Sequence, residues 1–166
     1  MKKIYFASPL FDEASRDWNK KVVAVIREKY DVQIYLPQEN SEINDKSDDS
    51  AEVTSLDIFN LDTKELVASD ILIANLDGGL EIDSGVACEV GYFAALCDQT
   101  PSKKIVGLIS DVRWNATNGA VGEQHGVYKN LYVIGAVKKY GMLIENDHQN
   151  YTNKIIKSLE LILDKK

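Results

Sequence analysis

One short apolar run, Asp-Ile-Leu-Ile-Ala-Asn-Leu at residues 70–76, constrains the possible fold more than any other feature of the sequence. Near-continuous apolarity over so few residues is typical of a central parallel strand that is buried on both faces. Such a strand requires neighbouring strands and a layer of helices on each side of the sheet. The run therefore indicates an α/β fold.

Short apolar runs and amphipathic stretches alternate along the rest of the chain. Further strands are predicted at residues 3–7, 32–36, 104–110 and 142–145. Helices are predicted at residues 12–30, 53–69, 84–97, 130–140 and 151–163. Strands and helices that alternate in this way form a parallel sheet with helices on both faces. We therefore predict an α/β, flavodoxin-like, doubly wound sheet of about five parallel strands, within a single domain that spans residues 1–166.

Two of the predicted helices have apolar side chains at helical spacing. In residues 12–30 this apolar face consists of Trp18, Val22, Val25 and Ile26. In residues 53–69 it consists of Leu56, Phe59, Leu66 and Val67. We expect both faces to lie toward the core.

The chain carries 26 acidic and 19 basic side chains, which gives a net charge of −7. An acidic protein without a basic run is a poor match to a nucleic-acid backbone or an anionic membrane. The first apolar run ends before Asp12, so it is too short for a signal peptide or a membrane span. Cys88 and Cys97 lie in an apolar stretch and are expected to be buried free thiols of a reduced compartment. We therefore expect a cytoplasmic protein.

The predicted fold selects particular loops for a binding site. In open α/β sheets, ligands bind beyond the carboxyl ends of the strands, where the strand order reverses. The loops that follow the first four predicted strands lie at residues 7–11, 38–41, 77–85 and from 110 onward. Functional side chains are expected in these loops.

The loop at residues 77–83 begins with Asp-Gly-Gly and ends at Asp83. Gly78 and Gly79 permit a sharp turn after the central strand. Asp83 directly precedes a predicted helix, and aspartate is a favoured N-cap residue. The sequence leaves open whether Asp83 is only a helix cap or also contacts a ligand.

Glu89 lies in the first half of the otherwise apolar helix at residues 84–97. A carboxylate in such surroundings is unfavourable unless it is paired or used in function. The alternative to a functional role is that Glu89 faces solvent, or that it forms a purely structural hydrogen bond with Tyr5. Gly91 narrows the helix close to Glu89 and would permit another group to approach it.

The interval between Lys64 and Lys103 contains seven acidic residues and no lysine or arginine. A pocket built from it disfavours a substrate held mainly by a phosphate, unless a distant base such as Arg113 supplies the charge. It favours a reaction that develops positive charge, such as one through an oxocarbenium-like sugar. Glu89, Asp83 and Asp62 supply the paired carboxylates that glycosyl transfer requires. No dinucleotide-binding, phosphate-loop or zinc motif occurs.

Four patches resemble the nucleoside 2-deoxyribosyltransferases, and together they span roughly residues 3–141. They are Ile-Tyr-Phe-Ala-Ser-Pro-Leu-Phe at 4–11, Asn-Leu-Asp at 60–62, Asp-Ser-Gly-Val-Ala-Cys-Glu-Val-Gly-Tyr at 83–92 and Asn-Leu at 130–131. The third patch is the most specific, because an aspartate, a glutamate six residues later and a Gly-Tyr pair occur together. The order and spacing of all four patches carry the resemblance.

The resemblance implies catalytic roles for three residues. Glu89 is expected to be the nucleophile that attacks C1′ and holds the sugar as an ester, and Tyr5 to orient its carboxylate. Asp62 is expected to protonate the departing base. The implied reaction exchanges the nucleobase of a 2′-deoxynucleoside by double displacement with retention of configuration, a step of nucleotide salvage and deoxyribonucleoside catabolism. It requires no metal and no organic cofactor.

The resemblance also implies substrate-binding residues. Asp83 is expected to bind the sugar hydroxyls, and Asn130 to reach the sugar in the site of a neighbouring subunit. The expected partners are therefore 2′-deoxynucleosides, free nucleobases and further copies of the same chain in a homo-oligomer. Gln38 and Asn40 lie where side chains that recognise the base are expected.

Two other functions remain open at this stage. One is a hydrolase of 2′-deoxynucleoside 5′-monophosphates, in which a serine replaces the residue that matches Asp83. Asp83 itself favours the transferase, because its negative carboxylate would repel the phosphate of a nucleotide. The other is a non-catalytic nucleotide-binding module, which has no need of a carboxylate at the position of Glu89. The sequence does not decide between Asp62 and Asp83 as proton donor, nor between purine and pyrimidine bases.

The chain departs from the family pattern in two places. It ends in Leu-Asp-Lys-Lys at residues 163–166, whereas members of the family can end in a tyrosine whose region closes the site. The segment 111–129 is long, and loops of this length are often functional. It is predicted to be either a lid, with Trp114 or Tyr128 stacking on the base, or an oligomer contact or plain loop.

Overall fold

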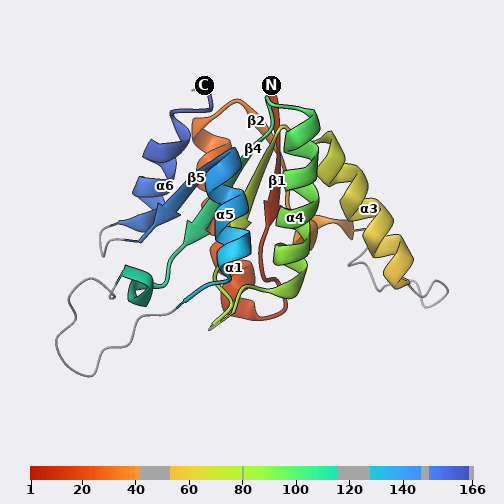
Figure 1. Ribbon diagram of the computed structural model, residues 1–166, viewed down its shortest axis with the longest axis horizontal. Helices are drawn as coiled ribbons and strands as arrows, with labels where there is room; N and C mark the ends of the chain where they lie inside the picture. Colours follow the sequence, from red (N-terminus) through yellow and green to blue (C-terminus); the bar gives the residue numbers. More distant parts are fainter. Residues whose placement is uncertain (42–52, 80, 116–127, 147–149, 165–166) are drawn as a thin grey trace.

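The computed structural model describes residues 1–41, 53–79, 81–115, 128–146 and 150–164. Five parallel strands form one sheet in the order β2-β1-β3-β4-β5 (Figure 1). They are β1 (Lys2–Ala7), β2 (Val32–Tyr35), β3 (Ile71–Asn75), β4 (Lys104–Ile109) and β5 (Gly141–Glu145). This is the predicted flavodoxin-like order, which reverses between β1 and β3.

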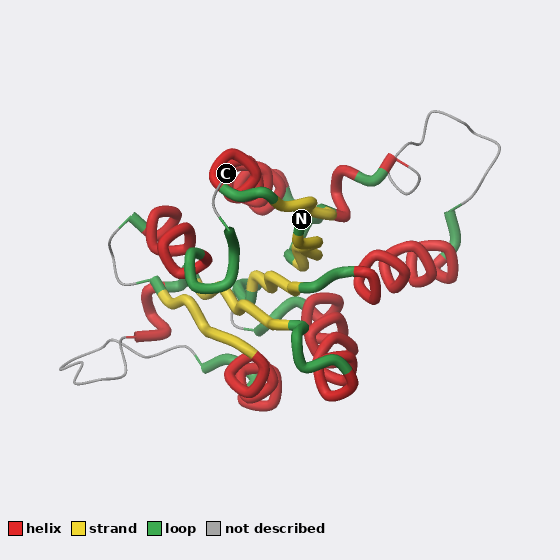
Figure 2. The backbone as a smooth tube through the Cα atoms, turned by 90° about the horizontal axis from the view of Figure 1, so that it is seen from above, coloured by secondary structure: helices red, strands yellow, loops and turns green. Residues whose placement is uncertain are grey.

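Helices cover both faces of the sheet, as the view from above shows (Figure 2). One face packs against α1 (Glu13–Lys29) and α6 (Tyr151–Leu159). The other face packs against α3 (Ser55–Ala68), α4 (Ser84–Gln99) and α5 (Leu131–Tyr140). Two short 3-10 helices, η1 (Pro37–Glu39) and η2 (Val112–Asn115), follow β2 and β4.

The predicted central strand is β3, and all five of its residues are buried. Because helices lie on both sides of it, neither face of this strand meets solvent, which explains its near-continuous apolar sequence. The predicted helix at residues 12–30 is also confirmed. Asp12 is its N-cap, where the side chain accepts a hydrogen bond from the backbone N–H of Ser15, and Tyr30 is its C-cap.

The predicted apolar face of α3 is only partly correct. Leu66 is buried, but Leu56 and Phe59 are 64% and 55% exposed, and Val67 is exposed too. The reason is the position of this helix at the side of its layer, beyond α4 (Figure 1). A helix with a neighbour on one side only cannot bury an apolar stripe along its whole length, so part of this stripe faces solvent.

The two cysteines also differ from each other. Cys97 is buried as expected, whereas Cys88 is exposed, because its side of α4 lines a groove between α4 and α3. The expectation of a buried Cys88 is therefore wrong. Near the end of the described chain, Leu163 is buried in the core between the sheet and the α1 and α6 layer. Within the described residues, no helix has the length and apolar character needed to cross a membrane.

Candidate active site

Tyr5 and Glu89 form the centre of the site. The hydroxyl of Tyr5, on β1, donates a 2.5 Å hydrogen bond to Oε1 of Glu89, on α4. The Tyr5 side chain is fully buried, and burial together with the charge of Glu89 raises the pKa of Tyr5. The phenol therefore remains a hydrogen-bond donor to the carboxylate at any physiological pH.

Glu89 titrates near neutrality. The pKa of Glu89 is raised from 4.5 to about 7, chiefly by burial, and the hydrogen bond from Tyr5 opposes this increase. The nearby charges of Asp62 and Asp83 also contribute to the increase. A carboxyl with this pKa is present in both its charged and neutral forms near neutral pH, which is a common property of catalytic groups.

A cavity of about 380 Å³ at the carboxyl end of the sheet brings the predicted carboxyls together. Asp62, Asp83 and Glu89 all line it. Phe11, Pro37 and Ile58 are among the apolar lining residues. A cavity with an apolar wall and a few converging polar groups is the usual form of a small-molecule site.

A second hollow, of about 230 Å³, opens between α3 and α4. It shares Asp62 and Glu89 with the first cavity, and its wall includes the aromatic side chains of Phe59 and Tyr92. The exposed side chain of Phe59 on α3 thus lies beside the candidate site.

Asp83 both caps a helix and lines the cavity, the two possibilities that the sequence left open. It caps α4, since its Oδ1 atom accepts hydrogen bonds from the N–H groups of Gly85 and Val86 at 2.9 and 3.1 Å. It also lines the cavity beside Glu89. A free helix N-terminus attracts phosphate groups, and here the carboxylate of Asp83 occupies that position.

The predicted turn before Asp83 is confirmed. Gly78 and Gly79 have φ angles of 150° and 75°, in the region that favours glycine. A Cβ atom at Gly78 would lie 2.6 Å from the carbonyl oxygen of Glu81 and 3.0 Å from the backbone nitrogen of Asp83. The turn is therefore too tight for a side chain at Gly78, and its shape places Asp83 at the start of α4.

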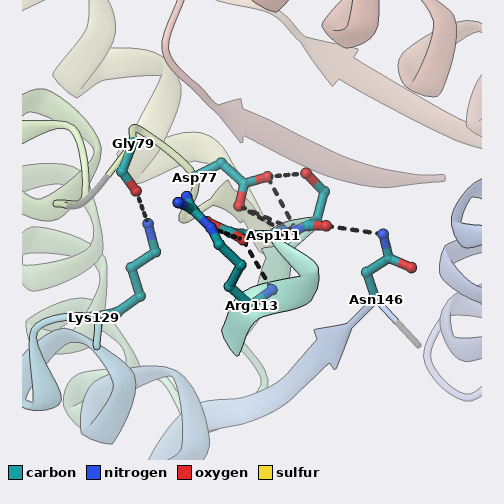
Figure 3. Close-up of polar contacts among 7 residues, drawn as sticks. Asp77, Gly79, Asp111, Arg113, Lys129 and Asn146 are labelled. Atoms are coloured by element: carbon teal, nitrogen blue, oxygen red, sulfur yellow. Dashed lines mark hydrogen bonds and ion pairs between the residues drawn. The ribbon is translucent and has the colours of Figure 1, made fainter. Parts of the chain in front are cut away.

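Polar contacts attach this turn to the neighbouring loops (Figure 3). The ammonium group of Lys129, which is only 2% exposed, donates a 2.8 Å hydrogen bond to the carbonyl oxygen of Gly79. The carboxylate of Asp77 accepts hydrogen bonds from the N–H and hydroxyl of Ser110 and from the N–H of Asp111. These contacts connect the turn before α4 to the end of β4 and to the residue before Asn130.

Asp62 is held by a residue that sequence reasoning missed. The hydroxyl of Tyr35 donates a 2.8 Å hydrogen bond to Oδ1 of Asp62. The side-chain amide of Asn40 donates a 3.0 Å hydrogen bond to the same hydroxyl. Burial raises the pKa of Asp62, whereas the hydrogen bond from Tyr35 lowers it. Tyr35 is the last residue of β2, and only the register of β1 and β2 reveals that it lies opposite Tyr5.

Gln38 and Asn40 lie outside the lining of the cavity at Glu89. The amide of Gln38 accepts a hydrogen bond from Asn19 and donates one to the backbone carbonyl of Arg16. Asn40 contacts Tyr35 and lines a separate hollow next to α3. Their roles in base recognition stay predictions, and the structure shows Asn40 one contact away from Asp62.

A buried polar network lies beneath the cavity and was not predicted. The hydroxyl of Ser8, a residue that lines the cavity, donates a 2.6 Å hydrogen bond to Asn19 and accepts one from Asn75. Asn19 is fully buried. Its position within the apolar pattern of α1 was the one signal in the sequence, since a buried amide needs partners.

Asn130 is exposed at the start of α5, which it caps by accepting hydrogen bonds from the N–H groups of Tyr132 and Val133. It does not line the cavity at Glu89 of its own chain. This position is compatible with the prediction that Asn130 binds the sugar in the site of a neighbouring subunit. Contacts within one chain do not test that prediction.

The segment after β4 has only part of its length within the described residues. The indole N–H of Trp114 donates to the carboxylate of Glu145, at the end of β5, and Trp114 packs against the core. Tyr128 is 76% exposed. Arg113 forms an ion pair with Asp111. The lid predicted for residues 111–129 falls largely on residues 116–127, outside the described part of the chain.

Gly91 and possible metal ligands remain to be described. A Cβ atom at Gly91 would meet no atom within 4 Å, so no group of the described chain uses the close approach that this glycine permits. Among the described residues, no group of three or more His, Cys, Asp or Glu side chains is arranged to hold a metal ion.

The fold and site define a class of protein: a doubly wound α/β protein with three carboxyls around a cavity at the point where the strand order reverses. The sequence model of the nucleoside 2-deoxyribosyltransferase family matches residues 4–132. The chain belongs to this family, as its motifs suggested. A search of the curated proteins found no match to this chain.

Solved structures support the same assignment. A conserved protein from Enterococcus faecalis V583 is 35% identical, with a TM-score of 0.76 over 97% of this chain and 98% of that chain. A 2-desoxiribosyltransferase from Leishmania mexicana is 25% identical, with a TM-score of 0.53 over 80% of this chain and 85% of that chain. A CMP N-glycosidase from Clostridium botulinum is 17% identical, with a TM-score of 0.54 over 96% of this chain and 98% of that chain. This likeness concerns the fold alone.

Proposed function

We propose that this protein is a nucleoside 2-deoxyribosyltransferase that exchanges the nucleobase of 2′-deoxynucleosides through a covalent ester on Glu89. The observation that carries the proposal is the Glu89 carboxyl, which receives a 2.5 Å hydrogen bond from Tyr5 and faces a cavity shared with Asp62 and Asp83. This arrangement supports Glu89 as the nucleophile, Tyr5 as the group that orients it and Asp62 as the second carboxyl that glycosyl transfer requires.

In the first step, an oxygen of Glu89 attacks C1′, and the bond between C1′ and the base nitrogen breaks. Its electron pair leaves with the base, which takes a proton from Asp62. In the second step, a nitrogen of another base attacks C1′, its proton passes to Asp62, and the ester bond to Glu89 breaks. Each attack inverts C1′, so the product keeps the configuration of the substrate.

Asp83 supports a nucleoside rather than a nucleotide as substrate. Its carboxylate occupies the N-terminus of α4 and lines the cavity. A 5′-phosphate placed there would meet a negative charge at the position where a phosphate-binding site needs free N–H groups. Hydrolysis of a nucleoside monophosphate is therefore the second candidate, which the experiment below separates from transfer.

Exposed side chains beside the cavity support a homo-oligomer with shared sites, which is part of this proposal. Leu56 and Phe59 are more than half exposed on α3, and Phe59 lines the hollow that leads to Glu89. Exposed apolar surface around an open site is typical of a protein interface. In such an oligomer, Asn130 of one subunit would complete the site of its neighbour.

The experiment is an exchange assay with thymidine and free adenine, followed by chromatography of deoxyadenosine, with deoxyuridine 5′-monophosphate in a parallel tube. We expect deoxyadenosine from the first tube and loss of that product in Glu89→Gln. Glu28→Gln, at an exposed position on α1, is the matched control and should retain activity. Release of uracil from the monophosphate without exchange would favour the hydrolase. Binding of nucleosides without turnover in either tube or in a purine-to-purine exchange would favour a non-catalytic module.

A further inference from the structure

The hydroxyl of Tyr35 has a fixed direction. A side-chain amide nitrogen only donates hydrogen bonds, so the 3.0 Å contact from Asn40 uses an acceptor lone pair of the Tyr35 oxygen. The single hydroxyl proton is then directed to Oδ1 of Asp62, 2.8 Å away. The three side chains form a one-way chain of donors that ends on the carboxyl of Asp62.

The ring of Tyr35 packs against the ring of Tyr5. Tyr5 and Tyr35 are register partners on the adjacent parallel strands β1 and β2. Their ring centroids are 5.2 Å apart, with an angle of 37° between the ring planes, within the range of favourable aromatic pairs. The two tyrosines therefore lie side by side on neighbouring strands and donate to different carboxyls of the site. Tyr5 donates to Glu89, and Tyr35 donates to Asp62.

We propose that Tyr35, oriented by Asn40, is a positioning residue that holds Oδ1 of Asp62 so that its Oδ2 delivers the proton to the departing base. This inference rests on the proposed function and adds to it the group that sets the geometry of proton transfer. It also gives Asn40 a role different from direct contact with the base. Proton transfer requires the donor and acceptor atoms within hydrogen-bond distance, so a carboxyl free to rotate would be a poorer acid.

The charged and titratable groups around Asp62 determine the form in which it acts. Tyr35 from β2 and Glu65 from α3 influence its pKa, and Asp62 in turn interacts with Tyr5 from β1 and Glu89 from α4. Burial raises the pKa of Asp62, the hydrogen bond from Tyr35 lowers it, and the charge of Glu65 raises it. Removal of the Tyr35 hydroxyl is therefore expected to raise the pKa of Asp62.

The decisive experiment compares two leaving groups in the full-length enzyme. Thymidine has a base that leaves with a proton, whereas the 2-deoxyriboside of 4-nitrophenol has a leaving group that departs as an anion. Tyr35→Phe keeps the ring and removes the hydroxyl. We expect the rate of leaving-group release in the first turnover to fall about tenfold or more with thymidine, and to stay within about twofold of the wild-type value with the nitrophenyl substrate. Asp62→Asn should show the same selectivity with a larger loss.

Tyr140→Phe is the matched control. It also removes a hydrogen bond from a tyrosine hydroxyl to an aspartate, at 2.5 Å to Asp98, but this pair lies on the exposed surface of α4 and α5. It should leave both substrates unaffected. If Tyr35→Phe slowed both substrates equally, or neither, Tyr35 would be a structural residue and the inference would be overturned. An effect of Tyr35→Phe that persisted undiminished in the Asp62→Asn background would overturn it too.

A separate measurement distinguishes failure of this inference from failure of the proposed function. The carboxyl resonance of Asp62, assigned from its absence in Asp62→Asn, is followed against pH by carbon-detected NMR. The pKa should rise in Tyr35→Phe and stay unchanged in Tyr140→Phe. If the wild-type protein processed neither substrate, the proposed function would fail. The titration would then show whether Tyr35 controls Asp62, and an unchanged pKa in Tyr35→Phe would overturn that link by itself.

Discussion

Tyr5 donates a 2.5 Å hydrogen bond to Oε1 of Glu89, although 84 residues separate the two along the chain. The fold produces this contact because β1 is an inner strand of the sheet, between β2 and β3, and α4 packs across the face to which Tyr5 points. The bond stabilises the anionic form of Glu89 against burial, which favours the neutral form. The reactivity of Glu89 therefore depends on a balance between these two effects.

This balance predicts the pH dependence of the reaction. In the proposed reaction only the carboxylate of Glu89 attacks C1′, and the pKa of Glu89 is about 7 in the free protein. On the acidic side, kcat/KM should therefore rise with pH through a midpoint near 7. Tyr5→Phe removes the bond that lowers this pKa, so the midpoint should move to higher pH and kcat/KM at pH 7 should fall about tenfold or more. A pH–rate series of the two proteins with thymidine and adenine tests this, and an unchanged midpoint would contradict it.

The same pKa predicts that ionised Glu89 lowers the stability of the fold at alkaline pH. The pKa of Glu89 is raised from 4.5 to about 7 on folding, so its contribution is fully present below 4.5 and is lost as pH rises through 7. Glu89→Gln, which cannot ionise, should exceed the wild type by about 2 kcal/mol in unfolding free energy at pH 8. The two proteins should be nearly equal at pH 4.5. Urea denaturation at both pH values measures the difference, and Glu28→Gln should show no comparable dependence.

Asp83 should control the choice between nucleosides and nucleotides. Asp83→Ser removes the negative charge from the start of α4 but keeps a residue that caps helices well. The ratio of kcat/KM for deoxyuridine 5′-monophosphate to that for deoxyuridine should rise about tenfold or more, because the repulsion of the phosphate is lost. Release of uracil from both substrates is measured by chromatography.

The stability of Asp83→Ser has its own control. Asn150 caps α6 by accepting a hydrogen bond from the N–H of Asn153, far from the cavity. Asn150→Ser should change the melting temperature by a similar small amount and leave the substrate ratio unchanged. A substrate ratio that stayed constant in Asp83→Ser would show that the charge of Asp83 does not select against phosphate.

Patterns along the chain predicted the strand order, the central strand and the turn at Gly78, because burial on both faces and a need for positive φ act locally. The family resemblance also predicted the contact between Tyr5 and Glu89 that the structure shows. Tyr35 was missed because its importance depends on the register between β1 and β2, which a single sequence does not contain. The apolar stripe of α3 was misjudged for a related reason, since periodicity does not say whether a helix has neighbours on both sides.

The turn before Asp83 should tolerate no side chain at Gly78. Gly78→Ala places a Cβ atom 2.6 Å from the carbonyl oxygen of Glu81 in a backbone conformation that alanine rarely adopts. We expect a loss of more than about 1 kcal/mol in unfolding free energy and a higher KM, because the turn must shift Asp83. Gly91→Ala, within α4 and without any atom in the way, should instead stabilise the protein by about 0.5–1 kcal/mol. Thermal unfolding of the two variants compares them directly.

Asn130 should act in the site of a neighbouring subunit. Its side chain caps α5 and does not line the cavity of its own chain, so a role at the sugar requires a second copy. Asn130→Ser keeps a capping residue and removes the amide, and it should be nearly inactive, as should Glu89→Gln. In a mixed dimer of the two variants, one site carries both defects and the other carries none. Equal co-expression should therefore restore about a quarter of the wild-type activity, because half of the dimers are mixed and each has one intact site. Two affinity tags isolate the mixed species, and activity no higher than that of the separate variants would place Asn130 outside the neighbouring site.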